Sequence, residues 1–198
     1  MILEELHIWN AYREGDQNAL ATIYTNYFDL LMEYGIRLTG DVEVVSDALH
    51  DLFLKLWANR SAQGEVAQIK AYLLVSLRHI IFNLLKKQKK TQNHSPEDFE
   101  NFELQFQWPD NDADLYKEHR EKLMMALNQL PARQKEIIYL RYVQEMEYAD
   151  IATAMDITLN SSYKLVHKAI ESLKDIIQVS GPVIPLMLNT LLPAFKKI

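Results

Sequence analysis

The sequence predicts an all-α protein made of two small helical domains. Apolar residues recur at steps of three and four along most of the 198 residues, as in helices that bury one face. Five glycines and six prolines are few, and period-two runs bounded by Asn-Gly or Asp-Gly turns are absent. We expect domains at residues 1–92 and 115–178, a flexible acidic linker at 93–114 and an apolar tail at 179–198.

Composition excludes several classes of protein. Without cysteine, the chain can hold neither a disulfide nor a thiolate metal site. The start, MILEELHIWN, lacks the basic residues and cleavage site of a signal peptide, and no stretch reaches the ~18 apolar residues of a membrane helix. P-loop, nucleophile-elbow and dinucleotide motifs are missing. We expect a cytoplasmic protein that is not an enzyme and has no cofactor and no small-molecule substrate.

Charge is distributed unevenly around a net value of −6. Val66–Pro96 holds six basic residues and no acidic ones, whereas Met1–Glu65 and Glu97–Glu118 are strongly acidic. A local basic patch can contact phosphates although the whole chain is acidic. Asp47 and His50 stand one helical turn apart, but no second carboxylate-x-x-His copy follows, so we expect no metal site.

The first helical block runs from about residue 18 to residue 90. Its segment SDALHDLFLKLW has an inward stripe with Trp57 on its shoulder, formed by Leu49, Leu52, Phe53 and Leu56. The opposite face carries an apolar centre with a charged rim, typical of a partner surface: Asp47, His50, Asp51, Leu54 and Lys55. An ordinary amphipathic helix with one exposed leucine is the alternative.

The next segment, IKAYLLVSLRHIIFNLLKKQKK, predicts a helix that ends in a cationic run. Its core-facing set is Tyr72, Leu73, Leu77, Ile80, Ile81, Leu84 and Leu85. Polar and basic residues project elsewhere, at Lys70, Arg78, Asn83, Lys86 and Lys87, and Lys89 and Lys90 extend the run. Cations near a helix C-terminus gain only a few tenths of a kcal/mol each, so six without counter-charge indicate a further role.

The second block has the pattern of a helix-turn-helix. EYADIATAM and LNSSYKLVHKAIESLK flank the joint DIT, and Thr158 is the expected N-cap of the second helix. The expected inward residues are Ile151, Ala152, Met155, Ser162, Val166, Ala169, Ile170 and Leu173. The outward face consists of Asn160, Ser161, Tyr163, Lys164, His167, Lys168 and Lys174, and its polar and cationic groups are concentrated in the N-terminal half. Such a face suits a major groove, and a plain surface helix is the alternative.

These residues carry a resemblance to a known family. LPARQKEIIYLRYVQEMEYADIATAMDITLNSSYKLVHKAIESLK resembles the minus-thirty-five-binding domain of bacterial sigma factors, in the extracytoplasmic-function (ECF) group, without a gap. The resemblance implies that Tyr163, Lys164, His167 and Lys168 contact DNA and that Arg141 contacts a phosphate. Asp156 replaces the family's usual turn glycine, and Asn160, Ser161 and Ser162 replace its usual Gly-Thr-Val.

The first block is similar to the polymerase-docking domain of the same family, in DQNALATIYTNYFDLLMEYGIRLTGDVEVVSDALHDLFLKLWANR. The resemblance implies that the helix containing Asp51 and Leu54 binds the clamp helices of the largest RNA polymerase subunit; the polymerase flap is a further expected contact. The lysine-rich helix and the loop at residues 60–68 would bind and melt the minus-ten element. The expected contacts are Lys70, Arg78, His79, Asn83, Lys86, Lys87, Lys89 and Lys90, with His79 where the family usually has asparagine.

The expected function is therefore that of a transcription initiation factor. It would bind core RNA polymerase and promoter DNA, and an anti-sigma protein is a further expected partner. One alternative is a stand-alone helix-turn-helix regulator that acts without polymerase. Another is a helical interaction module whose basic face binds an acidic partner.

The tail, VSGPVIPLMLNTLLPAFKKI, extends beyond the family pattern, which ends near Lys174. Gly181 and Pro182 should stop the preceding helix, leaving about two helical turns between Pro185 and Pro193. Its leucines are too apolar to stay solvated, so we expect them to complete the core of the second domain. The alternatives are an autoinhibitory bridge between the domains and a binding site for a partner.

Overall fold

The computed structural model describes residues 2–66, 68–90, 117–179 and 183–191. The chain divides into two compact units, residues 1–101 and 102–198. Every regular element within the described ranges is helical, and the second unit contains a helix-turn-helix, so the predicted fold class is confirmed. The predicted linker at 93–114 lies outside the described residues.

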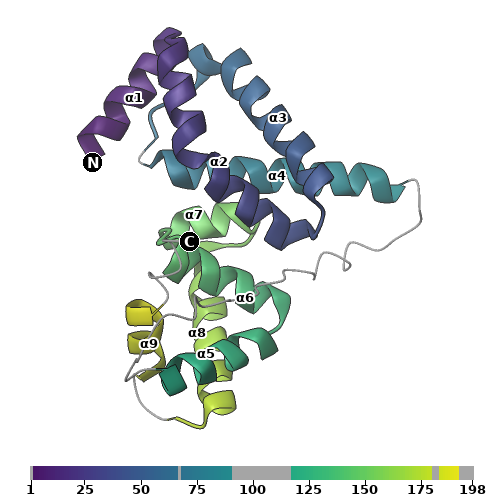
Figure 1. Cartoon of the computed structure of the whole chain (residues 1–198), viewed down its shortest axis with the longest axis vertical. Coiled ribbons are helices and arrows are strands. Elements are labelled where there is room, and N and C mark those ends of the chain that lie inside the picture. The colour runs from purple at the N-terminus through teal and green to yellow at the C-terminus, as the bar shows by residue number, and fades with distance from the viewer. Residues whose placement is uncertain (1, 67, 91–116, 180–182, 192–198) are drawn as a thin grey trace. The chain divides into compact units, whose positions relative to one another are not determined.

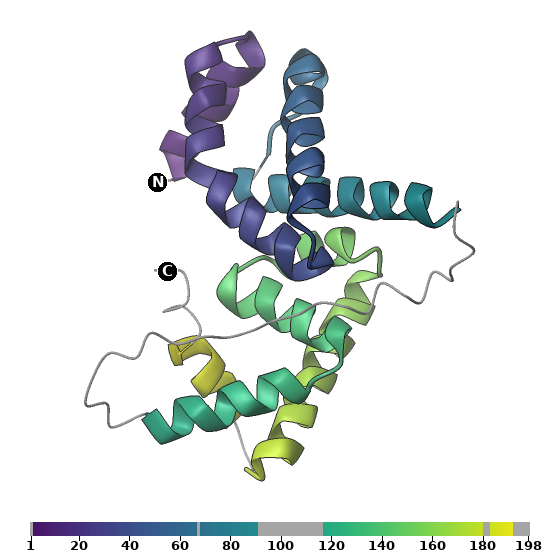
Figure 2. The ribbon, with the colours of Figure 1, turned by 45° about the vertical axis from the view of Figure 1, so that its right-hand side comes forward.

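In the part of the first unit that the structure describes, four long helices and one short one are present; Figure 1 shows how they are arranged. They are α1 (Ile2–Glu14), α2 (Gln17–Thr39), α3 (Val42–Ala58), the 3-10 turn η1 (Arg60–Ala62) and α4 (Ile69–Lys90). Figure 2 shows α2 and α3 side by side, with α4 crossing them. The helix α1 precedes the block that the sequence predicted, and it supplies two fully buried aromatic residues, Trp9 and Tyr12.

Local signals set the boundaries of α2 and α3. The Asp16 carboxylate accepts from the backbone N–H of Asn18 at 2.8 Å and caps α2. Gly40, with a φ of +67°, ends that helix in the left-handed conformation, and Asp41 then caps α3. The two helices approach closely at Gly35, where an added Cβ would lie 2.5 Å from a methyl carbon of Val45.

The buried faces of α3 and α4 differ in part from the predicted ones. Leu49, Leu52 and Leu56 are buried as predicted, but Phe53 is only half-buried. On α4, Leu73, Leu77 and Ile81 are buried, whereas four predicted core residues are half-buried: Tyr72, Ile80, Leu84 and Leu85. Ala71 and Leu74 are buried in their place. This helix is apolar on several sides, so periodicity alone does not select the covered side.

The second unit is built around α8 (Leu159–Ile177), which contacts its other α-helices. These are α5 (Lys117–Gln129), α6 (Ala132–Ile138), α7 (Tyr148–Ala154) and α9 (Val183–Leu191). A π-helical segment, η3 (Tyr139–Val143), continues α6. Of the eight predicted inward residues of the helix-turn-helix, all but the half-buried Ile170 are buried. Thr158 caps α8 as predicted, accepting from the Ser161 N–H at 3.1 Å.

The described part of the tail packs within the second unit. Ile184, Met187 and Leu188 of α9 are buried, and α9 contacts α8. This packing is what the core-completion hypothesis expects. Leu186, on the other side of α9, is 65% exposed.

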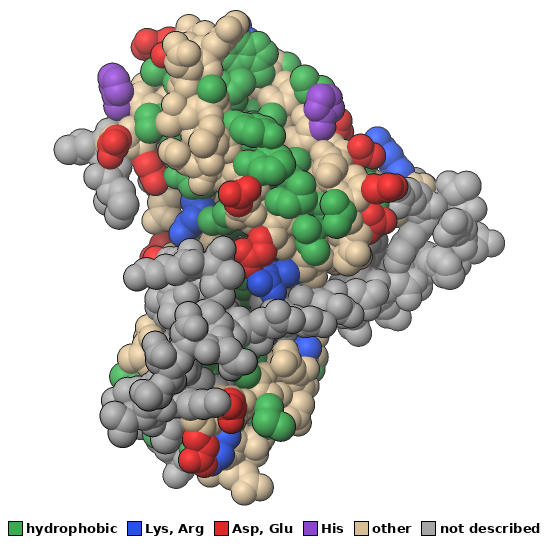
Figure 3. Space-filling view, in the orientation of Figure 1, with side chains coloured by type: hydrophobic (Ala, Val, Ile, Leu, Met, Phe, Trp, Pro, Cys, Tyr) green, Lys and Arg blue, Asp and Glu red, His purple; other side chains and the backbone are tan. Residues whose placement is uncertain are grey.

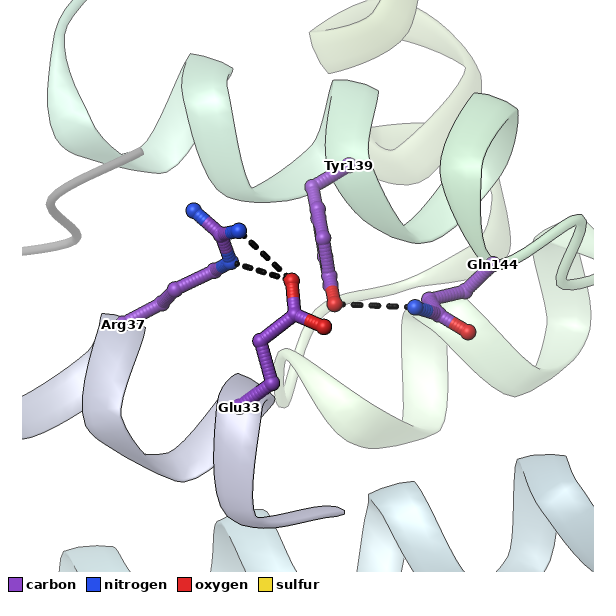
Figure 4. A network of polar contacts seen from close by, with 4 residues as sticks. All are labelled: Glu33, Arg37, Tyr139 and Gln144. Carbon is purple, nitrogen blue, oxygen red and sulfur yellow. Dashed lines mark hydrogen bonds and ion pairs between the residues drawn. The ribbon is translucent and has the colours of Figure 1, made fainter. Parts of the chain in front are cut away.

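Each unit also has a polar pair that ties successive helical turns (Figure 4). In α2, Arg37 Nε donates to Glu33 Oε1 at 2.9 Å. In the second unit, Gln144 Nε2 donates to the hydroxyl of the buried Tyr139 at 2.8 Å, linking the first residue of η3 to the residue that follows its end.

Asp156, which stands where the resembling family usually has glycine, lies in the turn between α7 and α8. Asp156 has a φ of +52°, a conformation in which the Cβ of most residues is strained and which glycine adopts freely. Aspartate is among the residues that tolerate it best. The turn therefore keeps its geometry without glycine.

We expect Asp156→Val to lower the free energy of unfolding by about 1–2 kcal/mol, because a β-branched residue is strained at positive φ. Asp156→Gly should be at least as stable as the parent. Urea unfolding followed by circular dichroism measures both. A valine variant as stable as the parent would contradict the strained turn.

Candidate polymerase and promoter interfaces

The predicted recognition face lies on the N-terminal half of α8. Its side chains are all exposed: Asn160, Ser161, Tyr163, Lys164, His167 and Lys168. Lys174, further along, is ion-paired with Glu171 at 2.7 Å, and the hydrogen bond from Lys174 lowers the pKa of that carboxyl. The positive charge available to an anionic ligand is therefore concentrated toward the start of α8, as the sequence predicted.

Ser162 fixes the start of α8 against α7. Its side chain is fully buried, and its hydroxyl lies 2.7 Å from the Leu159 carbonyl oxygen and 3.3 Å from that of Tyr148. A buried hydroxyl costs free energy unless it is hydrogen-bonded, and these carbonyls satisfy it. A serine therefore fits where the family usually has valine.

The Arg141 side chain makes several contacts within the second unit that the sequence did not predict. Its guanidinium lies 4.6 Å from the ring centroid of Tyr148, and Nη1 donates to the Met146 carbonyl at 2.7 Å. The Glu147 carboxylate is 3.7 Å away. Arg141 thus ties η3 to the start of α7, and a phosphate contact would use its remaining N–H groups.

Tyr148 connects this arginine to the recognition face. Its ring centroid lies 4.1 Å from that of Tyr163, so Arg141, Tyr148 and Tyr163 form a continuous stack. Stacking limits the orientations available to the half-exposed Tyr163 ring. The sequence did not indicate that Tyr148 lies beside the recognition face, because the two tyrosines belong to different helices.

The face predicted to bind the minus-ten element is only partly exposed. His79, Asn83, Lys86 and Lys87 are exposed and Lys70 is half-buried. The side chains of Lys89 and Lys90, at the end of α4, lie outside the described part of the structure.

The prediction that Arg78 projects outward is wrong. Its side chain is 7% exposed, and its guanidinium lies 4.2 Å from the ring centroid of Phe82. Arg78 follows Leu74 by four residues and precedes Ile81 by three, so the helix places it on the buried side with both. Arg78 therefore packs beneath this face and is not part of its exposed surface.

A cleft of about 730 Å³ opens beside His79. The loop at residues 59–66 forms one wall, and residues of α3 and α4 form the other, among them Leu52, Tyr72 and Ile80. The side-chain oxygen of Gln63 is buried here and has no hydrogen-bond partner among the described residues. The cleft therefore combines apolar and polar side chains.

The predicted polymerase-binding residues lie on α3. Asp47, His50, Leu54 and Lys55 are exposed, and Leu54 is 55% exposed. Asp51 is half-buried and pairs with Lys55 at 3.4 Å. The structure brings these side chains to one surface, as predicted.

Residues of α2 extend this surface. The Tyr24 ring, 44% exposed, stacks on Phe28 and packs at a tilt against Phe53, with centroids 4.9 and 4.8 Å away. A groove of about 400 Å³ adjoins them, lined by Gln17, Leu20, His50, Phe53, Leu54 and Trp57. Figure 3 shows apolar side chains gathered on the first unit, over α2 and α3. We call Leu20, Tyr24, Phe28, Phe53 and Leu54 the docking surface.

The four-residue spacing of Leu20, Tyr24 and Phe28 was the signal that sequence reasoning missed.

Within the described ranges, no three carboxylate or histidine side chains gather closely enough to hold a metal ion. No helix in those ranges is both long and apolar enough to cross a membrane.

Known proteins resemble both units. A family model described as sigma-70, region 4, matches residues 120–173. The ECF RNA polymerase sigma factor SigL of Mycobacterium tuberculosis is 24% identical over 172 residues, which cover 82% of this chain and 90% of SigL.

Two solved structures share the fold. Sigma factor RpoE from Bartonella quintana, in complex with the anti-sigma factor NepR, has a TM-score of 0.55 and 22% identity, covering 80% of this chain and 96% of that one. CnrH, in complex with the cytosolic domain of CnrY, has a TM-score of 0.55 and 12% identity, covering 89% and 99%.

The matched residues 120–173 include the helix-turn-helix and its recognition face. SigL extends the match over most of the chain. Together with the fold, these findings confirm the predicted family. Residues 120–173 match region 4 of the sigma-70 family, and over most of its length the chain is similar to an ECF sigma factor.

Proposed function

We propose that this sigma factor, which directs RNA polymerase to promoters and is not itself an enzyme, divides promoter recognition between its two units. The second unit reads the minus-thirty-five element with α8. The observation that carries this proposal is the capped start of α8, where exposed polar and cationic side chains stand on a helix whose other face is buried. Such a helix can enter a major groove, and Lys164 and Lys168 can contact phosphates.

The first unit binds and opens the minus-ten element. The cleft beside His79 is large enough for an unpaired base, and its Tyr72 wall is aromatic. Lys86 and Lys87 extend a positive surface along α4 for the strand backbone.

The docking surface is the proposed site for core RNA polymerase. Its apolar centre at Tyr24 and Leu54, with Asp51 and Lys55 beside it, has the composition of a protein interface. This surface favours the sigma-factor mechanism over a stand-alone regulator, which would need no such site. Because core polymerase is cytoplasmic, we infer that the protein acts in the cytoplasm.

An anti-sigma protein is a further proposed partner. RpoE and CnrH were both solved with a bound protein, NepR and the cytosolic domain of CnrY respectively. The docking surface of this chain is apolar, and its Tyr24 and Leu54 side chains are exposed, so a protein that covers it would block polymerase binding.

We expect Lys164→Ala combined with Lys168→Ala to weaken promoter binding by the reconstituted holoenzyme. Each lost phosphate contact should make the dependence of log affinity on log salt shallower by about 0.9. Binding titrations at several salt concentrations, with run-off transcription on the same promoter, measure the effect.

Lys122→Ala is the matched control, because Lys122 is an exposed lysine of α5 away from the recognition face. Its salt dependence should equal that of the parent. If the double variant also behaves as the parent, α8 does not read the promoter.

A further inference from the structure

We propose that α1 is a positioning element for promoter opening and that Trp9 holds the loop at residues 59–66 in place. The inference rests on the proposed role of that loop at the minus-ten element. Trp9 is fully buried, and its indole Nε1 donates to the Gly64 carbonyl oxygen at 3.0 Å. This hydrogen bond joins residues 55 positions apart in the sequence.

The Trp9 ring also contacts the wall of the cleft. Its centroid lies 5.3 Å from that of Tyr72, in an edge-to-face arrangement. Gly64 and Tyr72 both line the cleft beside His79. One side chain therefore touches both walls of the proposed base-binding site from behind, without being part of its surface.

Tyr12 anchors the same helix one turn later. Its ring lies 4.9 Å from that of Trp9, and its hydroxyl donates to the Leu56 carbonyl, near the end of α3. Burial raises the pKa of this hydroxyl, so it remains a donor throughout the physiological range. Helix α1 is therefore attached both to the end of α3 and to the loop that follows it.

The loop needs such an attachment. Ser61, Ala62, Gly64 and Glu65 are exposed, and among the described residues between α3 and α4 only the short turn η1 has regular structure. An exposed segment with little burial of its own samples many conformations. Fixing Gly64 lowers the entropy that is lost when an unpaired strand binds, which favours the open promoter without adding a contact to DNA.

Trp9→Phe tests this role, because it removes the indole N–H and keeps an aromatic ring in the core. In reconstituted holoenzyme, we expect unchanged binding to core polymerase. Opening of a duplex promoter, measured by permanganate reactivity of unpaired thymines, should fall about threefold to tenfold, the range set by one hydrogen bond. A promoter with a pre-melted minus-ten region should restore most of the activity.

Ile23→Val is the stability control, since Ile23 is fully buried in α2 and is not among the residues that line the cleft. It should open the duplex promoter normally. As a second measurement, hydrogen exchange of the free protein should be faster in Trp9→Phe at residues 60–66 but not in the middle of α2. Normal opening by Trp9→Phe, no recovery on the pre-melted promoter, or an equal defect in Ile23→Val would each overturn the inference.

Lys86→Gln combined with Lys87→Gln separates this inference from the proposed function. If that variant impairs opening and Trp9→Phe does not, only the positioning role fails. If both variants open promoters normally, the positioning role of Trp9 and the assignment of the first unit to the minus-ten element both fail.

Discussion

Replacing Leu54 and Asp51 together with alanine is expected to weaken binding to core RNA polymerase at least tenfold. Leu54 is 55% exposed, so its loss opens no cavity in the first unit. Asp51 forms an exposed ion pair with Lys55, and such pairs contribute little to folding stability. The few residues that dominate the affinity of an interface cluster near its centre, and truncating one of them costs about 2 kcal/mol or more. The loss should therefore appear in binding and not in unfolding.

Competition with the labelled parent chain for core polymerase measures this effect directly. Leu6→Ala is the matched control, because Leu6 is also an exposed leucine of the first unit, on α1 and outside the docking surface. It should compete as well as the parent. A double variant that competes equally well would show that polymerase does not bind this part of α3.

Leu188→Ala is expected to lower the free energy of unfolding of the second unit by about 2–5 kcal/mol, the usual cost of truncating a fully buried leucine. The total stability of a small domain is about 5–15 kcal/mol, so the loss is a large fraction of it. The cause is the packing of α9 against α8, where Ile184 and Met187 are buried beside it.

Leu186→Ala provides an unusually close control, two residues away on the same helix. Leu186 is 65% exposed, and its truncation should change stability by less than about 0.5 kcal/mol. Urea unfolding of both variants makes the comparison. Equal stabilities would mean that α9 does not complete the core of the second unit.

Activity distinguishes core completion from autoinhibition. If α9 only completes the core, Leu188→Ala should transcribe as well as the parent per folded molecule. Higher transcription at limiting core polymerase, with stability retained, would instead support an inhibitory tail.

The sequence by itself determined the features that depend on neighbouring residues. Asp16, Asp41 and Thr158 cap helices because a short polar side chain reaches backbone N–H groups two or three residues ahead. The buried stripe and polar face of α8 could be predicted because its apolar residues lie on one side of the helix, which is the side that is buried. The family resemblance depends on this same short-range pattern.

Tertiary structure decided what depends on residues far apart in the chain. Arg78 is buried because α4 is apolar on several sides, and packing selects which side is covered. The stack of Tyr148 on Tyr163 and the joint surface of Tyr24 and Leu54 each combine two helices. The hydrogen bond from Trp9 to Gly64 ends on a backbone carbonyl, a group that every residue has, so no side-chain pattern in the sequence marks it.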